Sequence, residues 1–211
     1  MNDHSLERAS SVTENTRAKF SLARGRIQRE LYRILFYDCP PLTKRVQNPV
    51  TKRGFDFKDT SEAKFRLAFH EELKKFRKVA IRLGRVSDGG SWIIKPEKTK
   101  DLLNHKITAN ELCETDVVYD ARQKGVDMKI GLDIASLSYK KSVDQIILIA
   151  GDSDFVPAAK LARREGIDFV LDPMWNHINT DLHEHIDGLI SGWPKPSSND
   201  KKIEALPQIS N

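Results

Sequence analysis

The sequence predicts an α/β protein, a three-layer α/β/α sandwich around a mainly parallel central sheet. Two observations lead to this prediction. Short apolar runs alternate along the chain with longer stretches in which apolar residues recur at helical spacing. The run over residues 146–150 is apolar throughout and stops at Gly151. Such a run is typical of a strand that is buried on both faces, as the strands of parallel sheets are.

The first part of the chain is predicted to form helices, a strand and a basic insertion. Residues 5–30 are charged, with apolar residues at roughly helical intervals, which indicates one or two helices. Residues 33–38 are predicted to be a strand that ends at Cys39-Pro40-Pro41, because proline cannot continue a ladder of hydrogen bonds. Residues 43–60 are rich in Lys and Arg around a proline and a glycine. They are predicted to form an exposed basic loop or hairpin.

The middle of the chain continues this alternation. A helix is predicted to begin at Ser61, because apolar residues follow at helical spacing and basic residues gather near the C-terminal end. Residues 79–86 are predicted to be a strand, residues 92–96 a short strand, and residues 98–114 a helix and loop. We expect residues 84–115 to form a second part of the basic insertion.

The second half carries the strongest pattern. A helix is predicted to begin near Asp127, and another over residues 156–165, with Gly166 in the C′ position that ends it. A strand over residues 167–171 and a last helix over residues 180–190 follow. We expect one domain over residues 1–193 and a disordered tail over residues 194–211, which are rich in Pro, Ser and Lys.

Composition narrows the class of protein. The 211 residues leave room for one medium domain with a full core. No apolar run approaches the length that spans a bilayer, and the N-terminus lacks the apolar stretch of a signal peptide. Cys39 and Cys113 show no metal-ligand spacing, so we expect a reducing cytoplasm. The net charge of +5 favours a polyanionic partner.

Four carboxylates are candidates to meet at one edge of the predicted sheet: Asp127, Asp133, Asp152 and Asp154. Asp152 follows the apolar strand, and ligands of open α/β sheets bind where the strands end. Carboxylates that lie close together repel one another unless protons or a cation intervene. A hard divalent cation with oxygen ligands therefore fits this set.

Each of these carboxylates also has a structural interpretation. Asp127, Asp152 and Asp154 are all placed where an aspartate caps a helix or turn. Asp127 and Asp133 are six positions apart, which is about 240° around a regular helix. Both can face one metal only if Asp127 lies just before the helix.

Basic and aromatic residues suggest how a polyanion would bind. Lys124, Lys129 and Arg122 flank the carboxylates, with Ser153 in the turn, and are assigned to substrate binding. The alternative is that the cations are simply solvated. Phe55, Phe57 and Trp92, within or beside the basic run, are either base-stacking platforms or core residues under a charged surface.

Several motifs together resemble the NYN domain family, a branch of the PIN-like nuclease fold. They are Lys124-Gly125-Val126-Asp127, Leu132-Asp133, Gly151-Asp152-Ser153-Asp154-Phe155-Val156-Pro157 and Gly166-Ile167. The resemblance covers about residues 30–190. It implies a metal-dependent ribonuclease that acts on RNA with Mg²⁺ or Mn²⁺. It also implies that Asp127, Asp133, Asp152 and Asp154 hold the metal.

The N-terminus departs from this family. Its members normally open with a buried strand that ends in a metal-binding aspartate, whereas this chain begins Met1-Asn2-Asp3-His4. We therefore expect the first strand to be missing or truncated, with Asp3 at its stump. This favours an alternative, a catalytically weak or inactive NYN module that binds RNA or a protein partner. A homo-oligomer is left open. A nucleotide-binding domain is disfavoured because the chain lacks glycine-rich phosphate loops.

Overall fold

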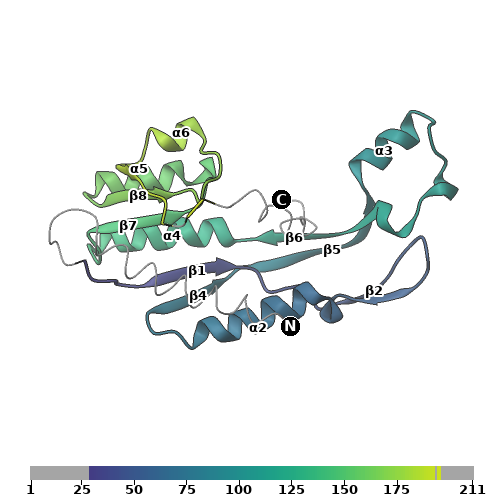
Figure 1. Ribbon diagram of the computed structural model, residues 1–211, viewed down its shortest axis with the longest axis horizontal. Coiled ribbons are helices and arrows are strands. Elements are labelled where there is room, and N and C mark those ends of the chain that lie inside the picture. The colour runs from purple at the N-terminus through teal and green to yellow at the C-terminus, as the bar shows by residue number, and fades with distance from the viewer. Residues whose placement is uncertain (1–28, 193, 196–211) are drawn as a thin grey trace. The chain divides into compact units, whose positions relative to one another are not determined.

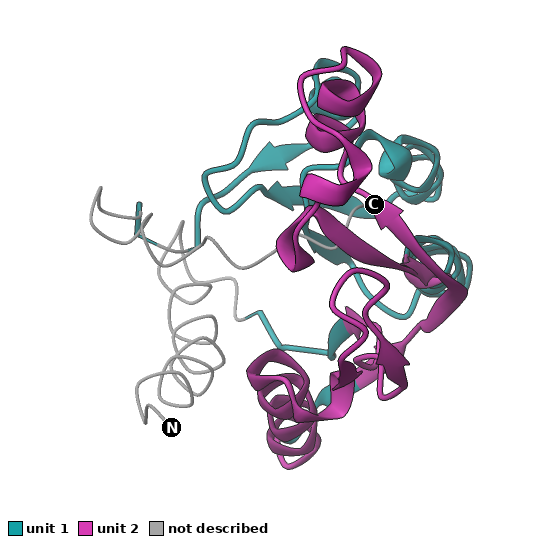
Figure 2. Ribbon diagram, turned by 90° about the vertical axis from the view of Figure 1, so that its right-hand side faces the viewer, with its two compact units in different colours: residues 1–36, 77–80, 127–208 teal, residues 37–76, 81–126, 209–211 magenta. Residues whose placement is uncertain are grey.

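The computed structural model describes residues 29–192, 194 and 195, which form a mixed α/β fold (Figure 1). The chain divides into two compact units (Figure 2). Of the described residues, unit 1 comprises residues 29–36, 77–80, 127–192, 194 and 195, and unit 2 comprises residues 37–76 and 81–126. Nearly all of the helical stretch predicted over residues 5–30, Asp3, and nearly all of the tail predicted from residue 194 lie outside the described residues; residues 29 and 30 are described and are not helical.

Unit 1 contains a three-stranded parallel sheet in the order β7-β8-β9. Its strands are β7 (Gln145–Ile149), β8 (Asp168–Asp172) and β9 (Gly188–Leu189). The register pairs Ile149 with Asp172, so the carboxyl ends of β7 and β8 lie at the same edge. The parallel pairing predicted from the apolar run of β7 is therefore found here.

Helices α4 (Val126–Tyr139), α5 (Val156–Arg164) and α6 (Thr180–His183) supply apolar residues to this sheet (Figure 1). Phe169 and Leu171 are two positions apart on β8, so they point to the same face. The core cluster contains Ile134, Leu148, Phe155, Ala159, Ala162, Ile167, Phe169, Leu171 and Leu182. The apolar residues at helical spacing and those at strand spacing thus pack into one core in unit 1.

The last two helices end for different reasons: α5 ends at a glycine that the sequence predicts, and the chain after α6 is held by a hydrogen bond to β8. Gly166 follows α5 with a φ of 77°, the left-handed conformation predicted for the C′ position. The helix predicted over residues 180–190, in contrast, ends at His183. Asp187 N–H donates to the Phe169 carbonyl with an N···O distance of 2.8 Å. This bond to β8 extends the chain into β9 instead of a further helical turn.

Strands β1 (Ile34–Asp38) and β4 (Val79–Leu83) pair with each other. The N–H of Ile34 donates to the Lys78 carbonyl at 2.8 Å, and the N–H of Gly84 donates to the Asp38 carbonyl at 2.7 Å. These bonds join the first residues of the two strands to each other and the last residues to each other, as in a parallel pair. The strand predicted over residues 33–38 is confirmed, and the one predicted over residues 79–86 ends at Leu83.

Unit 2 contains the predicted hairpin and helix. The strands β2 (Arg45–Gln47) and β3 (Gly54–Asp56) pair antiparallel, so the segment predicted to be a loop or a hairpin is a hairpin. The 3-10 turn η1 (Phe57–Asp59) leads into α2 (Ser61–Lys74). Thr60 is the N-cap of α2, and its side chain accepts a hydrogen bond from the third residue of the helix.

A long antiparallel ribbon completes unit 2. Its strands are β5 (Arg85–Ile94) and β6 (Val117–Lys124), with a bulge in the register between Asp88 and Trp92. The segment between the strands contains α3, η2 and η3 (Pro96–Leu103, Ala109–Glu111 and Glu114–Asp116). The two separate strands predicted over residues 79–86 and 92–96 are thus wrong in part, and β6 was not predicted at all.

The observed sheets are small, and both parallel and antiparallel pairs occur. One central sheet with helices on both faces therefore stays a prediction. Within the described ranges, no helix has the length and apolar character needed to cross a bilayer.

Candidate active site

The turn after β7 carries Asp152 and Asp154 at the carboxyl edge of the parallel sheet. β7 ends at Ile149. Three residues later, Oδ1 of Asp152 accepts a hydrogen bond from the Asp154 N–H, with an O···N distance of 3.0 Å. Asp152 is thus the N-cap of the 3-10 turn η4 (Ser153–Phe155). Both aspartates are solvent-exposed, so this edge is accessible to a ligand.

Asp154 is not the cap of the helix that follows. The N-cap of α5 is Phe155, which makes no side-chain capping bond, and Pro157 lies in the first turn. Proline at that position has no N–H that needs a cap. Ser153, which was assigned to substrate binding, is half-buried at the start of the turn.

Asp127 and Asp133 both lie inside α4. The helix begins at Val126, so Asp127 is in its first turn and does not precede it. Six positions correspond to about 240° of rotation, so the two side chains leave α4 on different sides. The structure therefore does not bring Asp127 and Asp133 together. Asp127 is exposed and Asp133 is half-buried.

The Lys124-Gly125-Val126 segment has a packing role. Gly125 has a φ of 81°, which favours glycine because a Cβ is strained in that region. A Cβ on Gly84 would lie 2.7 Å from the Lys124 carbonyl oxygen and 2.8 Å from the Cγ2 of Val126. This close approach requires glycine at position 84, so part of the motif positions β6 and the start of α4.

The predicted substrate-binding cations lie on different elements. Nε of Arg122 lies 3.0 Å from Oδ1 of Asp120, so its charge is partly neutralised. Lys124 is exposed at the end of β6, and Lys129 is exposed on α4. Arg122 and Lys124 belong to unit 2, and Lys129 belongs to unit 1.

A group that the sequence analysis did not single out lies at the end of β1. Arg66 donates to the Asp38 carboxylate through Nη2 and through Nε, the latter at 3.3 Å from Oδ2. Nε2 of His70 lies 2.8 Å from the same Oδ2, and His70 is only 4% exposed. Arg66 and His70 are four positions apart on α2, so they share one face of the helix.

The end of β1 offers a second candidate for the first strand that the family expectation places at the N-terminus. β1 is a strand of the expected kind, because Ile-Leu-Phe-Tyr precedes a terminal Asp38. The signal in the sequence was this apolar run ending in aspartate, together with the Arg66 and His70 spacing. The strand itself was predicted, but the metal-binding aspartate of the family was expected at the first residues of the chain, so Asp38 was not among the candidates.

Comparison with protein families matches residues 68–191, more than half of the chain, to the NYN domain. The chain belongs to the NYN domain family. NYN domains are PIN-like nucleases. The matched residues include the four predicted carboxylates, whereas β1 and Asp38 precede them. Neither the comparison with curated proteins nor that with solved structures found a match.

NYN and other PIN-like nucleases typically use divalent metals, which protein side chains with oxygen, nitrogen or sulfur atoms hold as ligands. Within residues 29–192, 194 and 195, no three His, Cys, Asp or Glu side chains are grouped as a metal site would require. The Asp38 carboxylate is instead engaged by Arg66 and His70. Mg²⁺ is usually held by one or two carboxylates together with waters and substrate phosphates, and the exposed Asp152 and Asp154, which share one turn, could supply such oxygen ligands.

The aromatic residues of the NYN chain's basic segment pack against one another. Ring centroids are 5.0 Å apart for Phe55 and Phe57, 5.3 Å for Phe57 and Tyr119, and 5.5 Å for Trp92 and Tyr119. Phe57 and Trp92 are half-buried, whereas Phe55 is exposed. This packing favours the interpretation of Phe57 and Trp92 as core residues of unit 2.

Lys44, Asp88 and Tyr119 form a hydrogen-bonded group beside these rings. Nζ of Lys44 lies 2.6 Å from Oδ2 of Asp88, and the Tyr119 hydroxyl donates to Oδ1 of Asp88 at 2.6 Å. The bonds from Lys44, from Tyr119 and from the Gly90 N–H lower the pKa of Asp88 from 3.8 to about 2. The group joins the start of the hairpin to the ribbon.

Removing the ammonium group of Lys44 tests whether that group lowers the pKa of Asp88. A lowered folded-state pKa means that the ionised Asp88 stabilises the fold above pH ~4, and that this contribution is lost as the pH falls toward 2. Lys44→Met is expected to raise the pKa of Asp88 toward 3.8, as measured by NMR titration of its carboxyl carbon. Tyr119→Phe should produce a smaller rise. An unchanged pKa in Lys44→Met would contradict the assigned cause.

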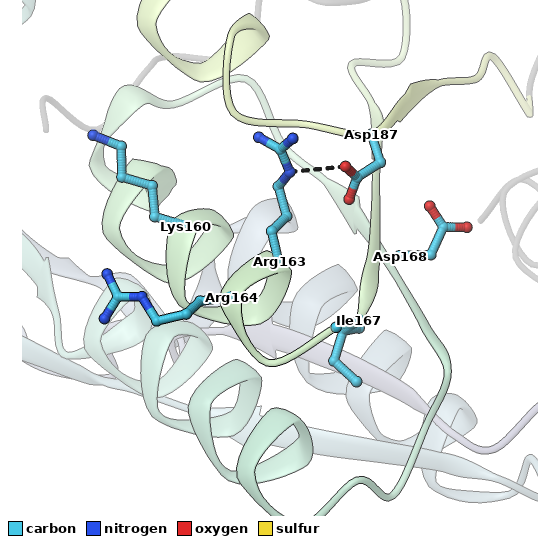
Figure 3. A pocket seen from close by; sticks show the side chains of 7 residues that line it. Lys160, Arg163, Arg164, Ile167, Asp168 and Asp187 are labelled. Atoms are coloured by element: carbon cyan, nitrogen blue, oxygen red, sulfur yellow. Dashed lines mark hydrogen bonds and ion pairs between the residues drawn. The ribbon is translucent and has the colours of Figure 1, made fainter.

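A cavity of about 690 Å³ lies elsewhere in unit 1, at the amino end of β8 (Figure 3). Lys160, Arg163 and Arg164 reach it from α5, and Asp168 and Asp187 border it. Nε of Arg163 lies 2.8 Å from Oδ1 of Asp187. Basic residues in the last turn of a helix also interact favourably with its dipole, so this group has a structural explanation.

Proposed function

We propose that this chain is a metal-dependent ribonuclease of the NYN type that hydrolyses phosphodiester bonds of RNA. The observation that carries the proposal is the family match, which includes the exposed Asp152 turn at the carboxyl edge of β7 and β8. Ligands of open α/β sheets bind at that edge. Asp152 and Asp154 are therefore the first residues to test, followed by Asp127 and Asp133.

Mg²⁺ or Mn²⁺ enters the proposal through the family and through the preference of these ions for carboxylate oxygens. When bound, such a cation would lower the pKa of an attacking water and neutralise charge on the phosphate. The described side chains have roles of their own. Asp152 holds the turn through its bond to Asp154 N–H, and Asp38, with Arg66 and His70, places a charged group at the end of β1.

The distribution of charge supports RNA as the substrate. The described residues of unit 2 carry more Lys and Arg than Asp and Glu, whereas those of unit 1 from Asp127 onward carry more Asp and Glu. Exposed cations of the hairpin segment are Arg45, Lys52, Arg53 and Lys58. Cations on a protein surface bind the phosphate backbone in a manner that depends on salt.

Both cysteines are thiols, which supports a reducing compartment such as the cytoplasm.

A second candidate is a catalytically weak or inactive NYN module that binds RNA or a protein partner. The observation that favours it is the ion pairing of Asp38. A carboxylate that is already bound by a guanidinium and an imidazole has less to offer a metal or a water. In this second function, Asp38, Arg66 and His70 stabilise unit 2, and the basic hairpin makes the contact to RNA.

Cleavage of labelled RNA distinguishes the two candidates. The purified chain is incubated with single-stranded and structured RNA in Mn²⁺, in Mg²⁺ and in EDTA. We expect cleavage in either metal and none in EDTA. Filter binding over a range of salt concentrations is measured on the same samples. Salt-sensitive binding without cleavage in any metal would reject the nuclease and establish the binding module.

A further inference from the structure

A loop beside the Asp152 turn presents a large aromatic side chain. Residues 173–179 connect β8 to α6, and both β8 and α6 contact the elements on either side of Asp152. β8 pairs with β7, and α6 packs against the turn Ser153–Phe155. A Cβ on Gly151 would lie only 3.2 Å from the His177 carbonyl oxygen. The backbone of the loop therefore borders the turn that carries Asp152.

Hydrogen bonds within unit 1 hold the first part of this loop in a defined conformation. Oδ1 of Asp172, a buried residue at the end of β8, accepts from Met174 N–H at 2.9 Å. Asn176 N–H donates to the Pro173 carbonyl at 2.9 Å, which closes a turn around Met174 and Trp175. The turn thus forms from residues of the loop and the adjoining strand end.

Both central residues of the turn have a strained backbone. Met174 has a φ of 48° and Trp175 a φ of 68°. Turns with positive φ at both central positions favour Gly and Asn, because larger side chains are strained there. Trp175 is nevertheless 47% exposed, so the side chain is not accommodated by burial in the core. Strained residues of this kind cluster at ligand-binding sites.

We propose that Trp175 stacks on an unpaired nucleobase of single-stranded RNA that lies beside Asp152. The proposal rests on the proposed function for its RNA substrate. An indole ring offers a large flat surface to a base of any sequence, whereas a base within a duplex is stacked on its neighbours. Nζ of Lys195 lies 6.0 Å from the centroid of the Trp175 ring, where it adds a positive charge for a neighbouring phosphate.

Equilibrium binding in EDTA tests this assignment apart from hydrolysis. A fluorescein-labelled single-stranded oligoribonucleotide and an RNA duplex are titrated with the wild type, Trp175→Ala, Trp175→Phe and Met174→Ala. Met174 is the matched control, because it shares the turn, the positive φ and the 47% exposure of Trp175. Trp175→Ala should weaken single-strand binding by about 5- to 100-fold, the range that loss of one stacked base implies.

The other variants separate stacking from a structural effect. Trp175→Phe should retain most of the affinity, and Met174→Ala should bind like the wild type. Duplex binding should be the same in all four proteins. If Trp175→Ala and Met174→Ala weaken binding equally, or if duplex binding falls as much as single-strand binding, Trp175 is not a stacking residue and the nuclease proposal stands. Trp175-dependent binding in a chain that cleaves no RNA would leave the stacking assignment intact and reject the nuclease.

Discussion

Asp152→Asn is expected to reduce RNA cleavage by about 100-fold or more, the loss that removal of one charged catalytic group typically causes. Asparagine keeps the side-chain oxygen that accepts the Asp154 N–H, so the cap of the turn is retained while the negative charge is removed. The measurement is the single-turnover rate on labelled RNA. The fold is checked by thermal unfolding, in which the variant should match the wild type.

Asp168→Asn is the matched control for this change. Asp168 is also an exposed aspartate at an edge of the same sheet, but it is the first residue of β8 and therefore lies at the amino edge. Its cleavage rate should stay within about 2-fold of the wild type, because catalytic effects depend on placement near the reacting atoms. Equal losses in both variants, or full activity in Asp152→Asn, would remove Asp152 from the active site.

Leu171→Ala is expected to lower the free energy of unfolding by about 2–5 kcal/mol, the range for a buried leucine truncated to alanine. Leu171 is fully buried on β8, the central strand of the sheet, and pairs with Leu148 on one side and Leu189 on the other. Its loss leaves a cavity in the core cluster of unit 1. Urea denaturation followed by circular dichroism measures the change, with the midpoint and slope compared between proteins.

Leu132→Ala makes the same chemical change at a position that is 63% exposed on α4. The free energy of unfolding should change by no more than about 0.5 kcal/mol, as surface substitutions usually do. The difference between the two variants isolates the effect of burial from that of side-chain size. A small loss in Leu171→Ala would mean that this cluster contributes little to the stability of unit 1.

Much of unit 1 could be predicted because its signals are local. The apolar run of β7, the Gly151-Asp152 turn and the glycine after α5 each depend on residues that are close in sequence. The boundaries agree within a few residues. The predicted helix over residues 180–190 was wrong beyond His183, because the bonds of Asp187 to β8 come from a segment far away in the chain.

The candidate site was only partly predictable. Asp152 and Asp154 were placed in one turn by their spacing alone. Whether Asp127 and Asp133 converge depended on where α4 begins, which the sequence placed only approximately. Asp38 was overlooked although its strand was predicted. Its partners Arg66 and His70 lie about 30 positions further along the chain, and only folding brings them to its carboxylate.

The sequence by itself determined the class of elements, the family and the carboxylates worth testing, because periodicity, turn residues and motifs are written in neighbouring positions. Tertiary structure alone decided which charges are paired, that β5 and β6 form a ribbon, and that the loop of residues 173–179, which carries Trp175, borders the turn after β7. These features depend on hydrogen bonds and contacts between residues that are distant in the chain. Each is selected by the free energy of the whole fold, and no local pattern of residues specifies it.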